Sequence, residues 1–138
     1  MLSPSPLFRQ VLVSVCLLAL LWLSSCAAGG PKFGEKGYTE KGKASYYSNK
    51  LRGNKMANGQ RYRPSKKTAA HKKLAFGTKV KVTNPKNGKS VKVRITDRGP
   101  FTPGRILDLS LKAALKLDLE KAGVAPVEME VVKEPKKK

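Results

Sequence analysis

The sequence is poor in the residues that usually hold metals or form disulfides. Among its 138 residues it has two cysteines, Cys16 and Cys26, and a single histidine, His71. A structural zinc site usually takes four cysteine or histidine ligands, so no metal site is expected, and no cofactor either. Both cysteines lie close to the N-terminus, so the rest of the chain has no pair that could form a disulfide.

Acidic residues are also scarce. Nine Asp and Glu stand against 29 Lys and Arg, which gives a formal net charge of +20. A cytosolic chain of this charge would suggest nucleic acid as a partner, whereas an exported one would meet anionic lipids, lipopolysaccharide and the carboxylates of the cell wall. The alternative is that the lysines simply keep the surface solvated. Between Glu40 and Asp108 the only carboxylate is Asp97, so Asp97 and His71 are the first candidates for proton chemistry.

Long hydrophobic runs are lacking except near the N-terminus. The apolar run over residues 11–23 has the length of a signal-peptide core and is too short for a membrane span. It ends in Leu23-Ser24-Ser25-Cys26, which fits the lipobox pattern of an aliphatic residue, two small residues and a cysteine. We therefore predict a lipoprotein signal peptide over residues 1–25 and acylation of Cys26. An ordinary secretory signal, cleaved near Ala28, is the alternative.

The predicted acylation determines where the chain would act. Two or three acyl chains anchor a protein firmly, because each buried CH₂ contributes about 0.8 kcal/mol. Cys26 is followed by Ala27 and not by aspartate, which favours the outer membrane in bacteria that sort as enterobacteria do. We expect a lipid-anchored monomer in the cell envelope, facing the periplasm, with a lipid membrane as one partner and no nucleic acid.

The remaining chain divides into a linker, one small domain and a tail. Residues 26–41 are rich in Gly, Lys and Glu and are expected to form the lipidated end and a flexible tether. Residues 42–132 are long enough for one domain with a modest core. Residues 133–138 are expected to form a solvated basic tail.

Within residues 42–132, apolar and polar side chains alternate with a period of two. Two alternating runs flank an Asn-Gly turn at residues 84–88, which predicts a β-hairpin with one apolar and one mostly cationic face. Its apolar positions are Val80, Val82, Val91, Val93 and Ile95. Further strands are expected at residues 44–47 and 127–131. This pattern indicates a mainly β fold, a small closed barrel.

One helix is expected over residues 111–118. Ser110 suits its N-cap, and Leu111, Ala114 and Leu115 form its apolar stripe.

Asp97 continues the alternating series of the second hairpin strand. In an unbroken strand its side chain would therefore point to the core side, just before Gly99-Pro100 ends the pairing. A carboxylate that points inward at a barrel mouth is either held by hydrogen bonds or kept for chemistry.

Taken together, the motifs resemble the rare lipoprotein A (RlpA) family in order and spacing over about residues 42–132. The resemblance implies a six-stranded double-psi β-barrel with one or two short helices, the fold also used by expansins. The motifs are Gly42–Tyr47, Ala57-Asn58-Gly59, Thr68–His71, Val80–Asn84, Asn87–Val91, Thr96–Phe101 and Arg105–Ser110.

The resemblance implies a lytic transglycosylase that acts on peptidoglycan. Active members of the family cleave the bond between N-acetylmuramic acid and N-acetylglucosamine in peptide-free glycan strands. The 6-hydroxyl of the muramic acid attacks its own anomeric carbon, so the product ends in a 1,6-anhydro ring. This needs an acid for the leaving oxygen and a base for the hydroxyl proton, and one carboxyl group can serve as both in turn. The second carboxylate of a hydrolase is not needed.

The resemblance assigns roles to particular residues. Asp97 matches the catalytic aspartate of the family and His71 its important histidine. The family motif commonly reads Ala-Asn-Gly-Glu, whereas this chain has Gln60, whose amide can position a sugar but cannot titrate. Gln60, Asn58, Tyr47, Arg98 and Phe101 are the expected substrate-binding residues.

Each assignment has a structural alternative. His71 could be a hydrogen-bonded barrel residue, Asp97 could form an ion pair with Arg94 or Arg98, and Asn58 could simply make a turn. The aromatic rings could belong to the core instead of stacking on sugars. Asp108, just before a helix cap, is expected to make a structural bond.

The functional alternative is a non-catalytic wall-binding module, as in expansins, because Gln60 cannot carry a proton. The sequence contains no denuded-glycan-binding SPOR domain of the kind that many relatives carry, so targeting to the division septum is not implied.

Overall fold

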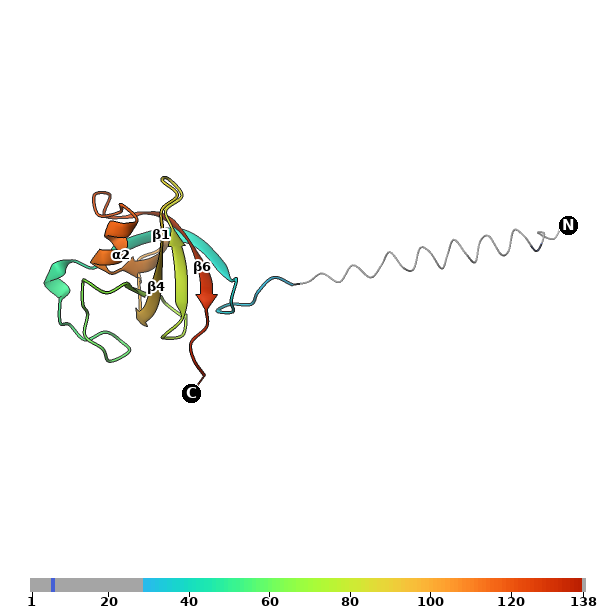
Figure 1. Cartoon of the computed structure of the whole chain (residues 1–138), viewed down its shortest axis with the longest axis horizontal. Helices are drawn as coiled ribbons and strands as arrows, with labels where there is room; N and C mark the ends of the chain where they lie inside the picture. The colour runs from blue at the N-terminus through green and yellow to red at the C-terminus, as the bar shows by residue number, and fades with distance from the viewer. Residues whose placement is uncertain (1–5, 7–28, 138) are drawn as a thin grey trace.

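The computed structural model describes residue 6 and residues 29–137, and it forms a closed barrel with short helices at its edge (Figure 1). The predicted signal peptide, apart from Pro6, and the predicted acylation site Cys26 lie outside the described residues. No helix of the described part is long and apolar enough to cross a membrane. In chain order the elements are β1 (Thr39–Tyr46), η1 (Asn49–Leu51), β2 (Thr68–Ala70), β3 (Lys79–Thr83), β4 (Ser90–Asp97), β5 (Arg105–Leu109), α2 (Leu111–Lys116) and β6 (Ala125–Lys133).

The six strands close in the order β1-β5-β2-β4-β3-β6, with β6 paired back to β1. Two neighbouring pairs, β1 with β5 and β2 with β4, are parallel, and the other four are antiparallel. The expected mainly β, six-stranded barrel is confirmed. Because the parallel pairs join segments that are distant in sequence, each end of the barrel is built from several separate parts of the chain.

The hairpin of β3 and β4 follows the predicted alternation. All five predicted apolar positions are buried, while Lys81, Lys92 and Arg94 between them are exposed. Each buried valine or isoleucine contributes about 1.5–3 kcal/mol, which fixes the register, since a slip by one residue would expose the whole set. The N–H of Gly88 closes the turn by donating to the carbonyl oxygen of Asn84 over 2.9 Å, and Asn84 Nδ2 donates to the carbonyl oxygen of Leu117 over 2.9 Å.

The predicted helix forms as α2, with Ser110 as its N-cap. The Ser110 Oγ accepts a hydrogen bond from the backbone N–H of Ala113. The apolar stripe differs from the prediction, because Leu115 is 50% exposed while Ala113, Ala114 and the following Leu117 are buried. The helix also ends at Lys116, with Leu117 as its C-cap, because Asp118 adopts a positive φ of 53°, so residues 117–118 are not helical.

Strands β2 and β5 have no alternating pattern that would reveal them. Ala69 and Ala70 are both buried, and so are the last three residues of β5. Strands that are covered on both sides read as continuous apolar runs, which periodicity does not distinguish from other buried segments. These two strands place Ala70 and Asp108 at one end of the barrel.

The segment before β1 contacts the barrel. The backbone N–H of Gly37 donates to the carbonyl oxygen of Val131 over 2.8 Å. The N–H of Val131 donates to the carbonyl oxygen of Tyr38, also over 2.8 Å. The Phe33 ring packs edge-on against Tyr38 at 5.1 Å. The last part of the expected tether is therefore ordered, and β1 covers Thr39–Tyr46, whereas a strand was expected at residues 44–47. At the other end, Lys133, expected in the tail, is the last residue of β6.

Candidate active site

Asp97 lies at the end of β4, just after an irregularity in the strand. Ala69 pairs with Ile95 and Ala70 with Asp97, so Thr96 is an extra residue that forms a β-bulge. Ile95 and Thr96 are both buried, and Asp97 is half-buried at the rim of the barrel. The simple alternation used to orient Asp97 therefore does not continue through Thr96.

Three hydrogen bonds hold the carboxyl group of Asp97. The hydroxyl of Tyr47 donates to Oδ2 over 2.8 Å, and the backbone N–H groups of Ala57 and Arg98 donate to Oδ1 over 2.8 and 2.9 Å. The donors come from three different segments, which fixes the orientation of this group tightly. The structural alternative for Asp97, an ion pair with Arg94 or Arg98, is not formed; Arg98 contributes its backbone N–H instead.

Tyr47 acts on Asp97 through its hydroxyl group. Burial is the main cause that raises the pKa of Tyr47, and the hydrogen bond and negative charge of Asp97 raise it further. The hydroxyl therefore stays protonated and donates. Its ring packs edge-on against Tyr62 at 5.2 Å. Tyr47 thus positions the carboxylate, a more specific role than the sugar contact predicted for it.

The loop that contains Asn58 and Gln60 wraps around the end of β4. Gly59 adopts a positive φ of 88°, which lets its N–H turn back to the carbonyl oxygen of Met56. The N–H of Asn58 donates to the carbonyl oxygen of Thr96 over 3.2 Å. The Asn58 side chain accepts from the N–H of Gln60 and donates to its Oε1, over 3.0 and 3.1 Å. Asn58 therefore makes the turn, and exposed Gln60 is held close to the end of β4.

His71 is a buried residue whose two ring nitrogens already have partners. Nδ1 accepts from the N–H groups of Lys73 and Leu74, each over 3.0 Å, so Nε2 carries the proton and faces Glu40 Oε2 at 3.2 Å. Burial lowers its pKa more than Glu40 raises it. Only its backbone N–H reaches Asp97, at the carbonyl oxygen, over 3.2 Å. The geometry favours positioning of the strand end over direct contact with substrate.

Arg98 and Phe101 follow Asp97 and point to different surroundings. The Arg98 guanidinium donates to the carbonyl oxygens of His71 and Leu74 over 3.2 and 2.9 Å and lies 3.9 Å from the centre of the Phe76 ring. It therefore fastens the loop after β2 and is not directed at Asp97. Phe101 is 81% exposed, so its ring is available to stack on a sugar face.

Asp108 makes the structural bonds expected of it, and the strand register also brings it to the same end of the barrel as Asp97. Ala70 pairs with Asp97 on one side and with Asp108 on the other, so the two aspartates are two strands apart and face the same side. Their Cα atoms are therefore roughly 10 Å apart. Asp108 Oδ1 accepts from Ser45 Oγ and from Arg105 Nη2, the latter over 3.1 Å. Its charge also raises the pKa of Tyr47.

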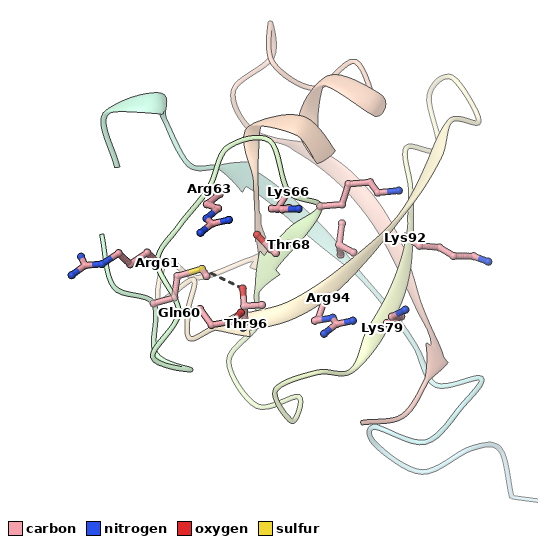
Figure 2. A pocket seen from close by; sticks show the side chains of 12 residues that line it. Gln60, Arg61, Arg63, Lys66, Thr68, Lys79, Lys92, Arg94 and Thr96 are labelled. Carbon is pink, nitrogen blue, oxygen red and sulfur yellow. Dashed lines mark hydrogen bonds between the residues drawn. The ribbon is translucent and has the colours of Figure 1, made fainter. Parts of the chain in front are cut away.

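A groove of about 910 Å³ begins at the Gln60 loop and runs over the outer face of β4 and β3. Figure 2 shows Gln60 and Thr96 toward one end and Lys79 and Lys92 toward the other. We call it the basic groove. It is lined by Met56, Gln60, Arg61, Arg63, Lys66, Lys67, Thr68, Lys79, Lys92, Val93, Arg94 and Thr96.

Across residue 6 and residues 29–137, no three His, Cys, Asp or Glu side chains come together as a metal site would require. The chemistry available at the rim is that of carboxyl, amide and hydroxyl groups.

Comparisons with known proteins agree with this fold. Residues 39–129 match the family model described as lytic transglycolase. An endolytic peptidoglycan transglycosylase RlpA from Vibrio cholerae is 53% identical over 97 residues, which are 70% of this chain and 37% of that protein. One from Campylobacter jejuni is 47% identical over 96 residues, 70% of this chain and 35% of that protein. The chain thus spans about a third of the length of these relatives.

Two solved structures share the fold. An expansin from Clavibacter michiganensis is 29% identical, with a TM-score of 0.56 over 72% of this chain and 53% of its own. A Streptomyces papain inhibitor, at 24% identity, has a TM-score of 0.58 over 71% of this chain and 97% of its own. These neighbours have the double-psi β-barrel fold that the resemblance implied. Because the matched residues 39–129 make up well over half of the sequence, the chain belongs to the lytic transglycolase family.

Proposed function

We propose that the chain is an RlpA-type lytic transglycosylase of peptidoglycan. It would cleave the bond between N-acetylmuramic acid and N-acetylglucosamine in peptide-free strands and leave 1,6-anhydro ends. The observation that carries this proposal is the fixed carboxyl group of Asp97 at the barrel rim, next in the chain to Thr96, which lines the groove. Relatives at about 50% identity named for this activity support it.

Asp97 would serve as the acid and then as the base. It first gives a proton to the glycosidic oxygen as the bond from that oxygen to the anomeric carbon breaks. The 6-hydroxyl of the same muramic acid then bonds to the anomeric carbon, and its proton returns to Asp97. No water is consumed, and the carboxyl group ends in its starting form. The donors from Tyr47, Ala57 and Arg98 keep it in place throughout the cycle.

Gln60 and Asp108 would have supporting roles. Exposed Gln60 can donate hydrogen bonds to a sugar hydroxyl or acetamide from the edge of the basic groove. Asp108 supplies the second carboxyl group on this face, and its Oδ2 lies against Gly99, on the side of exposed Phe101. In this position it would stabilise the positive charge that develops at the anomeric carbon.

We also infer a location in the cell envelope. Relatives named for peptidoglycan imply it, and the lipobox-like sequence before Cys26 supports a lipid anchor in the outer membrane with the barrel in the periplasm. The chain would act there as a monomer.

A second candidate is a wall-binding module without catalysis. Two observations favour it: Gln60 replaces a group that could titrate, and the expansin neighbours include a variant described in complex with cellohexaose. In that case the rim would hold a glycan without cutting it.

The deciding experiment is digestion of amidase-treated sacculi by the full-length chain and by Asp97→Asn. We expect the wild type to release peptide-free sugars with anhydro ends, detected by mass spectrometry, and the variant to release none. If neither releases products while both sediment with the glycan, the binding module is the correct function.

A further inference from the structure

The basic groove is positively charged along its whole length. Seven of its lining residues are cationic, and none of those that line it is acidic. In the described part of the chain, the Lys and Arg residues that form ion pairs lie elsewhere, at Lys41, Lys89 and Arg105. The cations of the groove are Arg61, Arg63, Lys66, Lys67, Lys79, Lys92 and Arg94.

The strand register brings like charges together in this groove. Lys79 pairs directly with Arg94, and Lys92 pairs with Lys81 across the same two strands. Like charges directly opposite each other destabilise a sheet. The arrangement therefore costs the fold stability, and an anion lying along β4 would relieve the repulsion.

The side chains of the groove limit the kind of anion that fits. No aromatic residue lines it, so it offers no ring on which a neutral sugar or a nucleic-acid base could stack. Its apolar lining residues, Met56 and Val93, are buried and could not insert into a bilayer, and the groove is concave where a membrane is flat. Charge, distributed along about 13 Å of strand from Lys92 to Thr96, is what the groove presents.

We propose that the basic groove binds a linear acidic polysaccharide through its carboxylates and leads it to the rim at Asp97. Arg94, Lys79 and Lys92 form the part of this surface farthest from Gln60, and they act by charge and not by fit to a particular sugar. The identity of the natural polymer rests on the proposed function: it would be a wall glycan with free lactyl carboxylates. Binding itself requires no cleavage.

The test uses the full-length chain and two probes of known charge. Polygalacturonate carries a carboxylate on every sugar, and chitohexaose carries none. The triple variant Lys79→Gln/Lys92→Gln/Arg94→Gln should bind polygalacturonate about tenfold to a hundredfold more weakly at low salt, with a shallower salt dependence.

A matched control removes three exposed lysines on and after α2, Lys112→Gln/Lys116→Gln/Lys121→Gln, which changes net charge equally and lies outside the groove. It should bind as the wild type does. Equal losses in both triple variants would show that only net charge matters, and would overturn the proposal. Strong wild-type binding of chitohexaose that the groove variant retains would overturn it as well.

Two further arms separate the natural sources of charge. Amidase-treated sacculi should bind the wild type less after their carboxylates are converted to amides, and unchanged binding would refute the inference. The groove variant is also tested on vesicles that contain phosphatidylglycerol. If it loses vesicle binding but keeps polygalacturonate binding, the groove binds lipid, and the proposal is wrong. Asp97→Asn should keep all polysaccharide binding. Absence of cleavage by the wild type, with polygalacturonate binding intact, would refute the proposed function and leave this inference standing.

Discussion

Replacing Tyr47 with phenylalanine removes a single oxygen atom, the one that donates to Asp97 Oδ2 over 2.8 Å. The ring and its edge-on packing against Tyr62 would remain. A hydrogen bond to a charged group contributes about 1.5–3 kcal/mol, and Asp97 would keep its two backbone donors. We expect a loss near the lower limit, about 1.5 kcal/mol in the free energy of unfolding and roughly tenfold in the rate of cleavage.

The two effects are measured separately. Thermal unfolding should show a fall in Tm of roughly 5–10 °C for a domain of this size. Release of anhydro-ended sugars from amidase-treated sacculi, at a temperature where the variant is folded, gives the rate. Tyr62→Phe is the matched control, because its hydroxyl bonds to the backbone of Leu111 and Tyr47 and not to Asp97. It should lose stability with little change in rate. Cleavage by folded Tyr47→Phe at the wild-type rate would refute the view that this hydroxyl holds the catalytic carboxyl group.

Four other substitutions test the rest of the rim. Gln60→Glu should raise turnover about tenfold by adding a group that can titrate, and a folded variant with no gain in rate would contradict this. Asp108→Asn should slow cleavage at least about tenfold. Ser45→Ala, which removes only one donor to Asp108, should slow it much less. Equal rates of cleavage by these two variants would exclude a role for the charge of Asp108. For His71, burial lowers the pKa below the unfolded value of about 6.5, so its contribution to stability is present above that pH and is lost as the pH falls through the folded pKa. Urea unfolding at pH 5 and pH 7.5 should therefore show a larger acid loss for the wild type than for His71→Asn, and an equal loss would contradict it.

Local patterns in the sequence predicted part of this structure well. The alternation of Val80 and Val82 with lysines, the Asn-Gly turn and the N-cap of Ser110 are determined by neighbours in the chain, and each forms as expected. Leu115 shows the limit of such reasoning, since a six-residue helix buries only the side that packs on the barrel.

The site itself depended on contacts between distant segments. The bulge at Thr96 appears only when β4 is paired with β2, so the orientation of Asp97 could not be obtained from alternation along β4 alone. Asp108 reaches the site only because the short strand β2 pairs with β5 as well as β4. Glu40, the partner of His71 Nε2, likewise comes from a distant segment, whereas the two backbone donors to Nδ1 are near neighbours in the chain.

Ala70 separates the two carboxyl groups by backbone pairing on both of its sides. The spacing between Asp97 and Asp108 is therefore set by the width of a hydrogen-bonded sheet, which hardly varies between proteins, and not by the packing of side chains. Loops around the rim, such as the one that carries Gln60, can change in sequence without altering this distance. A glutamate at position 60 would therefore meet the same separation of the two carboxyl groups as Gln60 does.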